Sequence, residues 1–567
     1  MIRDPELGRL ADAVLIPPFP GHMPPRWVLA GLEGGLAGVT LFGPNVSDPE
    51  QIALLTGALR GAADEPVIAI DEEGGDVTRV TYWSGSLYPG NAALGAIDDP
   101  ELTERVHRAI GTDLAQLGIN VDLAPCVDVL DGEENPAIGT RSFGADPALV
   151  SRHAAAAVRG LQSAGVAATA KHFPGHGSTR ADTHEVVASI TGDLAEVRRR
   201  DLPPFQASIA AGVAAIMPGH LRLPELTGEL PASLSAAAMT GLLRGELGFD
   251  GTIISDALEM RAVSGPYGIP EASVMAIIAG VDLLCLGRDV PEEEYQAIVA
   301  AVSEAARSGR LPAGRLEEAA DRVAKLRAWL AAERVKRGLV GAGGAGGALA
   351  GAGGSLAGGS LAGGPAERNG VGVGLQAARR AVQISGDLSR SGDLSRSGDL
   401  SRSGGRPSLT DPLIVEVEPP GNVAVGRAAW GLGPWAPASS VRRIVASSSS
   451  PAAAGLDGAE EAGACTSVGP VPIPLEEGEE PAEQASAADV LAAAAGRSLV
   501  LVVRDAYRSP ATQDLVTSVL AERPDAIVVE MGLPVWRPPA GAAYVATWGA
   551  ARVNAQAAAE VLGLVTG

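Results

Sequence analysis

The sequence contains a run, Gly165-Val166-Ala167-Ala168-Thr169-Ala170, followed at once by Lys171-His172-Phe173-Pro174-Gly175-His176-Gly177. The first half is short and apolar, which is typical of a buried strand. The proline and glycines of the second half interrupt regular structure. The polar residues are therefore predicted on a loop that leaves the carboxyl end of a strand. Parallel α/β folds place their chemistry at such positions.

Similar apolar runs recur through the first 335 residues, and segments of helical character separate most of them. Eight parallel strands alternating with helices over this length predict an α/β fold of the (β/α)8 TIM-like barrel type. A doubly wound open sheet gives the same alternation, but the count of eight favours the barrel. The predicted strands are Ala13–Pro17, Gly38–Phe42, Pro66–Asp71, Asn120–Pro125, Val166–Lys171, Ala214–Pro218, Gly251–Asp256 and Val281–Leu286.

Polar residues gather where these predicted strands end, as a barrel with one functional face requires. Five strand ends with such residues predict a polar cavity on one face of the barrel. They are Asp71-Glu72-Glu73-Gly74-Gly75 with Arg79 soon after, Cys126-Val127-Asp128 with Arg141 on its loop, Lys171-His172, His220, and Ser255-Asp256-Ala257-Leu258-Glu259.

The loop after the fifth strand continues to Asp182-Thr183-His184, and three interpretations of it compete. Its histidines could bond to neighbouring backbone in a purely structural loop. They could bind a metal, although Pro174 and Gly175 between His172 and His176 prevent a helix from presenting both imidazoles. The third interpretation is acid–base catalysis, in which the Asp182 carboxylate holds the His184 imidazole and raises its pKa.

Asp256 lies just past the β-branched run Thr252-Ile253-Ile254. It could be a helix N-cap, because aspartate is favoured where a helix begins. Paired with the loop that carries Asp182 and His184, it supplies a nucleophile beside a proton donor. Glycoside cleavage needs this pair, one group to attack the anomeric carbon and one to protonate the departing oxygen. A histidine would replace the carboxylic acid that usually donates the proton.

The motifs Lys171–Gly177, Asp182–His184 and Ser255–Met260 together resemble glycoside hydrolase family 3, and within it the bacterial β-N-acetylglucosaminidases. The resemblance implies a nucleophile at Asp256 that forms a covalent glycosyl-enzyme with retention of configuration. It implies an acid/base at His184 with Asp182 as its partner on a mobile loop. Asp76 departs from the family, in which many members carry a basic residue there. The implied sugar-binding residues are Asp71, Arg79, Arg141, Lys171 and His172.

The resemblance also implies the substrate, a small saccharide with a non-reducing terminal β-linked N-acetylglucosamine. N-acetylglucosamine glycosides, muropeptides and chitin fragments all remain open, and neither a cofactor nor a metal is expected. A histidine acid/base need not repel anions as a glutamate would, so phosphate is a possible acceptor beside water. An N-acetylglucosaminide phosphorylase and a catalytically inactive sugar-binding relative are the alternatives.

Composition and net charge argue against some classes of binding partner. The 567 residues carry a formal net charge of −23, which argues against nucleic acid and an anionic membrane surface. The three cysteines are far apart, and Cys126 and Cys285 lie in or beside apolar runs, so buried thiols are expected rather than disulfides. The absence of a secretory signal and of a long apolar run predicts a soluble, cytoplasmic protein.

The composition changes after the barrel, for which we predict residues 1–337, closed by a helix over Pro312–Arg337. A Gly/Ala-rich linker is expected at 338–375 and a C-terminal α/β sandwich domain at 376–567, similar to the second domain of many family members. Three Ser-Gly-Asp-Leu-Ser-Arg repeats from Ser385 to Arg402 indicate an expanded loop over 385–405. Glu530, at the end of a predicted strand, is a less favoured acid/base.

Overall fold

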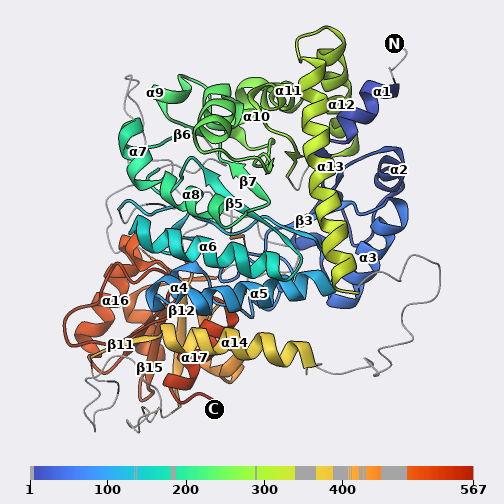
Figure 1. The fold of residues 1–567 in the computed structure, drawn as a ribbon. Coiled ribbons are helices and arrows are strands. Elements are labelled where there is room, and N and C mark those ends of the chain that lie inside the picture. Colours follow the sequence, from blue (N-terminus) through green and yellow to red (C-terminus); the bar gives the residue numbers. More distant parts are fainter. Residues whose placement is uncertain are drawn as a thin grey trace, which may run out of the picture.

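The computed structural model describes residues 5–132, 135, 137–179, 187–287, 290–338, 365–386, 388, 407, 409, 411–419, 425–426, 429–447 and 482–565, with only the backbone over 365–371. Eight parallel strands surround one centre in the first part of the chain (Figure 1). They are β1 (Leu15–Ile16), β2 (Gly38–Leu41), β3 (Val67–Ile70), β4 (Val121–Asp122), β5 (Ala167–Phe173), β7 (Ala215–Pro218), β9 (Thr252–Ile253) and β10 (Leu284–Cys285).

The strands close into a barrel. Six form one parallel sheet in the order β2-β3-β4-β5-β7-β9, and β1 pairs in parallel with β10. A parallel bridge between Ile254 and Leu283 joins β9 to β10, and the Thr40 N–H donates to the Pro17 carbonyl at 3.3 Å between β2 and β1. The predicted (β/α)8 barrel is confirmed, and the open-sheet alternative is wrong.

The helices around the barrel begin at local signals in the sequence. Three of them start at an Asp-Pro pair, in which the carboxylate accepts a backbone N–H of the first turn and the proline occupies the first helical position. Each signal therefore fixes the residue at which its helix begins. The three are α3 (Pro49–Ala62), capped by Asp48, α5 (Pro100–Gln116), capped by Asp99, and α6 (Pro147–Ser163), capped by Asp146.

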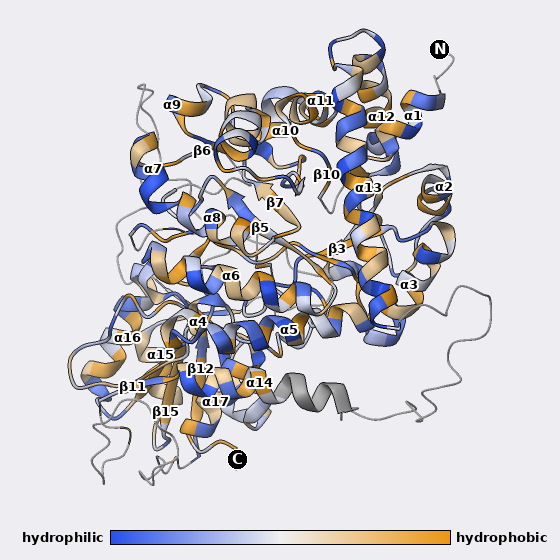
Figure 2. Ribbon diagram, viewed as in Figure 1, coloured by the Kyte–Doolittle hydropathy of each residue, from blue (hydrophilic) through white to orange (hydrophobic). Residues whose placement is uncertain are grey.

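The inside of the barrel is filled with apolar side chains and closed at one end by α13 (Ala313–Lys336). Val323, Leu326 and Leu330 of α13 pack against Val67 and Ala167, which lie at the amino-terminal ends of their strands. Hydrophobic and hydrophilic residues alternate along α13 (Figure 2), as one buried face requires. The predicted closing helix is confirmed, and the opposite end is left for the polar loops.

The second part of the chain forms a seven-stranded sheet in the order β11-β17-β16-β15-β12-β13-β14, parallel except for the antiparallel β11–β17 pair. Alternate residues face opposite sides of each strand. One face packs on α15 (Ala487–Ala493) and α16 (Pro510–Glu522), the other on α17 (Arg552–Val561). The strands are β11 (Gln383–Ser385), β12 (Leu413–Val417), β13 (Val441–Ala446), β14 (Glu483–Ala485), β15 (Leu499–Val503), β16 (Ile527–Glu530) and β17 (Ala543–Ala546).

The two parts of the chain are in contact through α14 (Pro365–Ala381), which begins inside the predicted linker. It packs against α5 and α4 (Asn91–Ile97) of the barrel and against α17 (Figure 1). Its Arg380 forms a 2.7 Å ion pair with Asp99 at the start of α5. The repeats from Ser385 to Arg402 lie almost wholly outside the described residues.

Cys126 and Cys285 are free and buried, as predicted, whereas Cys465 lies outside the described residues. Within the part of the chain that the structure describes, no helix combines the length and the apolar character needed to cross a membrane.

Candidate active site

The loop after β3 turns back on itself at Gly74 and Gly75, whose φ angles are +75° and +62°. Both conformations favour glycine, and a Cβ at Gly75 would lie 2.5 Å from the Gly90 Cα. Glu73 is held at the start of this turn, where its N–H donates to the Val77 carbonyl at 3.1 Å. The two glycines are therefore needed to bring the Glu73 carboxylate into the polar end of the barrel.

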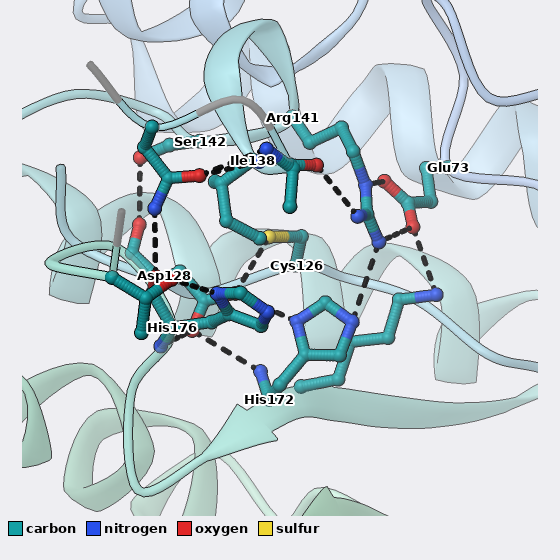
Figure 3. A network of polar contacts seen from close by, with 12 residues as sticks. Glu73, Cys126, Asp128, Ile138, Arg141, Ser142, His172 and His176 are labelled. Atoms are coloured by element: carbon teal, nitrogen blue, oxygen red, sulfur yellow. Dashed lines mark hydrogen bonds and ion pairs between the residues drawn. The ribbon is translucent and has the colours of Figure 1, made fainter. Parts of the chain in front are cut away.

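The Glu73 carboxylate joins two buried cations. Arg141 donates two hydrogen bonds to it, from Nε at 3.0 Å and from a terminal nitrogen at 2.7 Å, and Lys171 Nζ lies 2.8 Å away. Figure 3 shows the guanidinium facing this carboxylate. Burial alone would raise the pKa of Glu73, but Arg141 and Lys171 outweigh burial and lower it. Glu73 is therefore ionised and fixes both cations.

Lys171 comes from the end of β5 and reaches back to β3. Its ammonium also contacts Asp71 Oδ1 at 2.6 Å, so two carboxylates share it. The side chain of Asp71 is 20% exposed and that of Lys171 only 3%. Burial lowers the pKa of Lys171, but Asp71 and Glu73 together raise it above its ordinary value. The partly exposed Asp71 is thus an acceptor held in place by a buried cation.

Arg141 is positioned from several sides. Its backbone carbonyl accepts a 2.7 Å hydrogen bond from the Asn91 side chain, which is buried at the start of α4. Its guanidinium also donates to the Ala137 carbonyl at 3.1 Å. The terminal nitrogen that donates to Glu73 also lies 3.3 Å from His172 Nε2. A long loop thereby holds Arg141 as firmly as a strand would.

Asp128 orients the two histidines after β5 (Figure 3). Its Oδ2 accepts from His172 Nδ1 at 2.7 Å, and its Oδ1 accepts the His176 backbone N–H at 2.6 Å. Because Nδ1 donates to Asp128 and Nε2 faces Arg141, the network places a proton on His172 Nδ1. Burial, followed by the proximity of His172, lowers the pKa of His176 to about 4, so the His176 ring is neutral near pH 7.

Asp256 lies past β9 and is half-buried. Its Oδ1 accepts the Ala257 N–H at 2.8 Å, and the Ala257 carbonyl accepts from His220 Nε2 at 3.0 Å. The buried thiol of Cys285 has its pKa raised by burial and further by Asp71, Glu259 and Asp256. Asp71 follows β3 and Asp256 follows β9, so both lie at the carboxyl end of the barrel.

Arg79 is held through its backbone, because its N–H donates to Glu72 Oε2 at 2.8 Å, and its side chain is half-buried. Asp182 and His184 lie outside the described residues, so their pairing stays a prediction. The chain on either side of them is joined, since Thr191 Oγ1 donates to the Ser178 carbonyl at 3.2 Å. Ser178 and Thr191, which flank the undescribed residues in the sequence, therefore lie side by side.

Among the described residues, one group has the geometry to hold a metal ion. It consists of Cys126, Asp128 and His172, whose possible ligand atoms lie within 4.8 Å of one another. All three already share hydrogen bonds, since the Cys126 thiol and His172 Nδ1 both contact Asp128 Oδ2. The guanidinium of Arg141 lies beside the only other ring nitrogen of His172 and would repel a cation. The donor set thus fits a hydrogen-bonded network better than a metal.

Sequence reasoning identified Glu73, Asp128 and His220 as strand-end residues without assigning them roles, and it missed Asn91. Glu73 was detectable, because it lies two residues after Asp71 in one acidic run. Asn91 carries no such signal, since asparagine is common in loops and at helix ends. Among the predicted sugar-binding residues, the structure brings together Asp71, Lys171, Arg141 and His172.

Acid should weaken the folded state through Asp128, whose pKa is lowered to about 2 by His172 and His176 against the opposing effect of burial. Its stabilisation is complete above the unfolded pKa of about 4 and is lost as pH falls toward 2. Asp128→Asn should therefore reduce the free energy of unfolding by on the order of 2 kcal/mol near pH 7. In urea unfolding between about pH 3 and 7, the gap between variant and wild type should shrink with acid; a constant gap would contradict this account.

Parts of this chain are similar in sequence to known glycosyl hydrolases. A model of the glycosyl hydrolase family 3 N terminal domain matches residues 30–326. Beta-hexosaminidase of Stenotrophomonas maltophilia (strain K279a) is 40% identical over 255 residues, which cover 44% of this chain and 75% of that protein. Beta-hexosaminidase A of Pseudoalteromonas piscicida is 34% identical over 317 residues, which cover 52% of this chain and 53% of that protein.

A similar solved structure extends over both parts of the chain. It is a glycoside hydrolase family 3 beta-N-acetylglucosaminidase from Paenibacillus sp. str. FPU-7, with a TM-score of 0.75 and 27% identity. The match covers 99% of this chain and 97% of that one. These relatives support a glycoside hydrolase of the β-hexosaminidase type.

Proposed function

Because this chain belongs to glycosyl hydrolase family 3, we propose that it removes non-reducing terminal β-linked N-acetylglucosamine from a small saccharide. The names of the similar proteins, beta-hexosaminidase and beta-N-acetylglucosaminidase, support this sugar. The observation that carries the proposal is the buried cluster of Asp71, Glu73, Lys171, Arg141 and His172 at the end of the barrel where Asp256 lies.

Asp256 is the nucleophile in this proposal. Its carboxylate attacks the anomeric carbon as the glycosidic bond breaks, which forms a covalent glycosyl-enzyme, and a second displacement restores the configuration. The Ala257 N–H donates to Oδ1 and so helps to orient the attacking carboxylate. Because His220 fixes the Ala257 carbonyl, the carboxylate needs little reorientation before attack.

The polar cluster binds the sugar. The Asp71 carboxylate accepts from sugar hydroxyls, and Lys171, Arg141, Arg79 and His172 contact further hydroxyls or the acetamido group. The ion pairs with Glu73 fix the first two cations before substrate arrives, which reduces the entropy lost on binding.

His184, held by Asp182, is the proposed acid/base. His184→Ala should reduce kcat by about 10²- to 10⁴-fold on glycosides with a poor leaving group, because their departing oxygen needs a proton. The first step should be affected little for an activated leaving group such as p-nitrophenolate. A leaving-group series measured on wild type and variant tests this. An equal loss across the series would contradict proton donation by His184.

The acceptor distinguishes a hydrolase from a phosphorylase, which a histidine acid/base permits because it need not repel phosphate. The test is turnover of p-nitrophenyl β-N-acetylglucosaminide with and without phosphate, beside the matching β-glucoside. Release only from the acetamido sugar supports the proposal. Sugar 1-phosphate as product would establish a phosphorylase. No release from either sugar would favour a sugar-binding protein without catalysis.

The natural substrate and location are also part of the proposal. Muropeptides would place the enzyme in peptidoglycan recycling in the cytoplasm, whereas chitin fragments would give it a different role. Assays on both classes with the purified full chain would separate them.

A further inference from the structure

Asp76 is a buried carboxylate that contacts both parts of the chain. Its side chain is 1% exposed and forms a 3.0 Å ion pair with Arg504, which is 8% exposed. Its Oδ1 accepts the Ala550 N–H at 2.8 Å, and its Oδ2 accepts from the Thr140 hydroxyl at 2.6 Å. Two of these partners belong to the second part of the chain and one to the barrel.

The barrel side of this contact leads directly to the polar cluster. Asp76 follows Glu73 by three residues, across the turn at Gly74 and Gly75. Thr140 is the residue before Arg141. One buried carboxylate therefore joins the loop that carries Glu73 to the loop that carries Arg141, the two partners of a buried ion pair in the cluster.

The other side of the contact is equally well fixed. Arg504 follows β15, and the next residue, Asp505, has a φ of +52°. The buried Glu530 accepts the N–H groups of Asp505 at 2.8 Å and Ala506 at 3.2 Å. Glu530 thus organises this turn, in place of the acid/base role considered from the sequence. Tyr507, in the same turn, also approaches the Arg141 loop. Its hydroxyl lies 3.9 Å from the position that a Cβ on Gly139 would occupy.

A buried ion pair is a weak source of stability, because the desolvation of both charges offsets their attraction. Apolar residues would hold the two parts of the chain together equally well. The contacts of Asp76 instead fix the orientation of its carboxylate. One oxygen accepts from the Ala550 N–H, and the other is shared by Thr140 and Arg504. This geometry also explains an acidic residue at position 76.

We infer that Asp76 and Arg504 are positioning residues, through which the second part of the chain holds the Glu73 and Arg141 loops in the arrangement that binds sugar. The inference rests on the proposed function for its kinetic consequence, but not for its structural one. Without the pair, Arg141 should lose its alignment with Glu73, and a misplacement of about 1 Å can cost about 10²-fold in rate.

The test compares Arg504→Met, Asp76→Asn, the double variant and the conservative Arg504→Lys in the full chain. Hydrogen–deuterium exchange should rise in peptides covering 72–80 and 137–145 in both single variants. KM for the aryl N-acetylglucosaminide should rise about tenfold or more, with a smaller change in kcat. The double variant should be no worse than either single one, because the effects are coupled, and Arg504→Lys should recover part of the loss.

Arg380→Gln is the matched control, because it removes another ion pair between the two parts of the chain, 2.7 Å long, and neither Arg380 nor Asp99 belongs to these two loops. It should change neither exchange in these peptides nor KM. Unchanged exchange in Arg504→Met, or equal changes in Arg380→Gln, would overturn the inference. An inactive wild type would refute the proposed function alone, since the exchange measurement does not depend on turnover.

Discussion

Replacing Asp256 with alanine is expected to abolish turnover of p-nitrophenyl β-N-acetylglucosaminide and to leave the protein folded. The carboxylate forms the bond to the anomeric carbon, so its removal leaves no route to a glycosyl-enzyme, and kcat should fall by at least about 10⁴-fold. The side chain is half-buried and accepts a hydrogen bond from the adjacent Ala257 N–H. Stability should therefore change by less than about 2 kcal/mol.

Asp250→Ala is the control for this experiment. Asp250 lies six residues earlier, has a side chain 90% exposed, and forms only a 3.6 Å ion pair with Arg322. Its removal should leave kcat within about twofold, as for surface substitutions away from a site. A folded Asp256→Ala variant that retains a tenth of the activity would exclude Asp256 as nucleophile.

Replacing Glu73 with glutamine should damage both stability and binding. Glutamine keeps the shape but removes the charge that balances Arg141 and Lys171, and both cations are less than a tenth exposed. Breaking a buried ion pair from one side costs about 3 to 5 kcal/mol. The freed guanidinium should also lose its orientation, which should raise KM by about tenfold or more. Urea unfolding and steady-state kinetics measure the two effects.

Glu104→Gln is a matched control at the surface. Glu104 also joins two arginines, Arg108 at 2.9 Å and Arg159 at 3.0 Å, but both arginines are half exposed. Exposed pairs contribute about 1 kcal/mol or less, so this variant should be nearly neutral. If the two substitutions cost the same free energy of unfolding, the charges around Glu73 are not what stabilises the cluster.

The barrel was predictable because every strand of a closed parallel sheet is covered on both sides. Most strands therefore appear in the sequence as mainly apolar runs, and even β4 and β9, which pair over only two residues, lie within such runs. The second sheet was less visible. β13 contains Arg442 and Arg443, and β17 contains two alanines, so neither has the composition of a buried strand.

The site was predictable only as a set of strand ends. Nothing local in the sequence couples Glu73 to Arg141, which lies 68 residues further along the chain. The contact of Asp76 with Ala550 spans 474 residues. Such pairs arise from the closure of the barrel and from the docking of the second sheet. Residue types and spacing thus indicated which groups perform the chemistry, whereas the residues that hold them required the structure.

The most direct test of the proposed mechanism is to trap the glycosyl-enzyme. A fluorinated N-acetylglucosaminyl donor with an activated leaving group should react once and add one sugar to the protein, because the fluorine slows both displacements whereas the activated leaving group speeds only the first. Intact mass and peptide mapping should place the sugar on Asp256. Attachment to another residue, or rapid turnover without any adduct, would contradict the central claim that Asp256 forms the covalent intermediate.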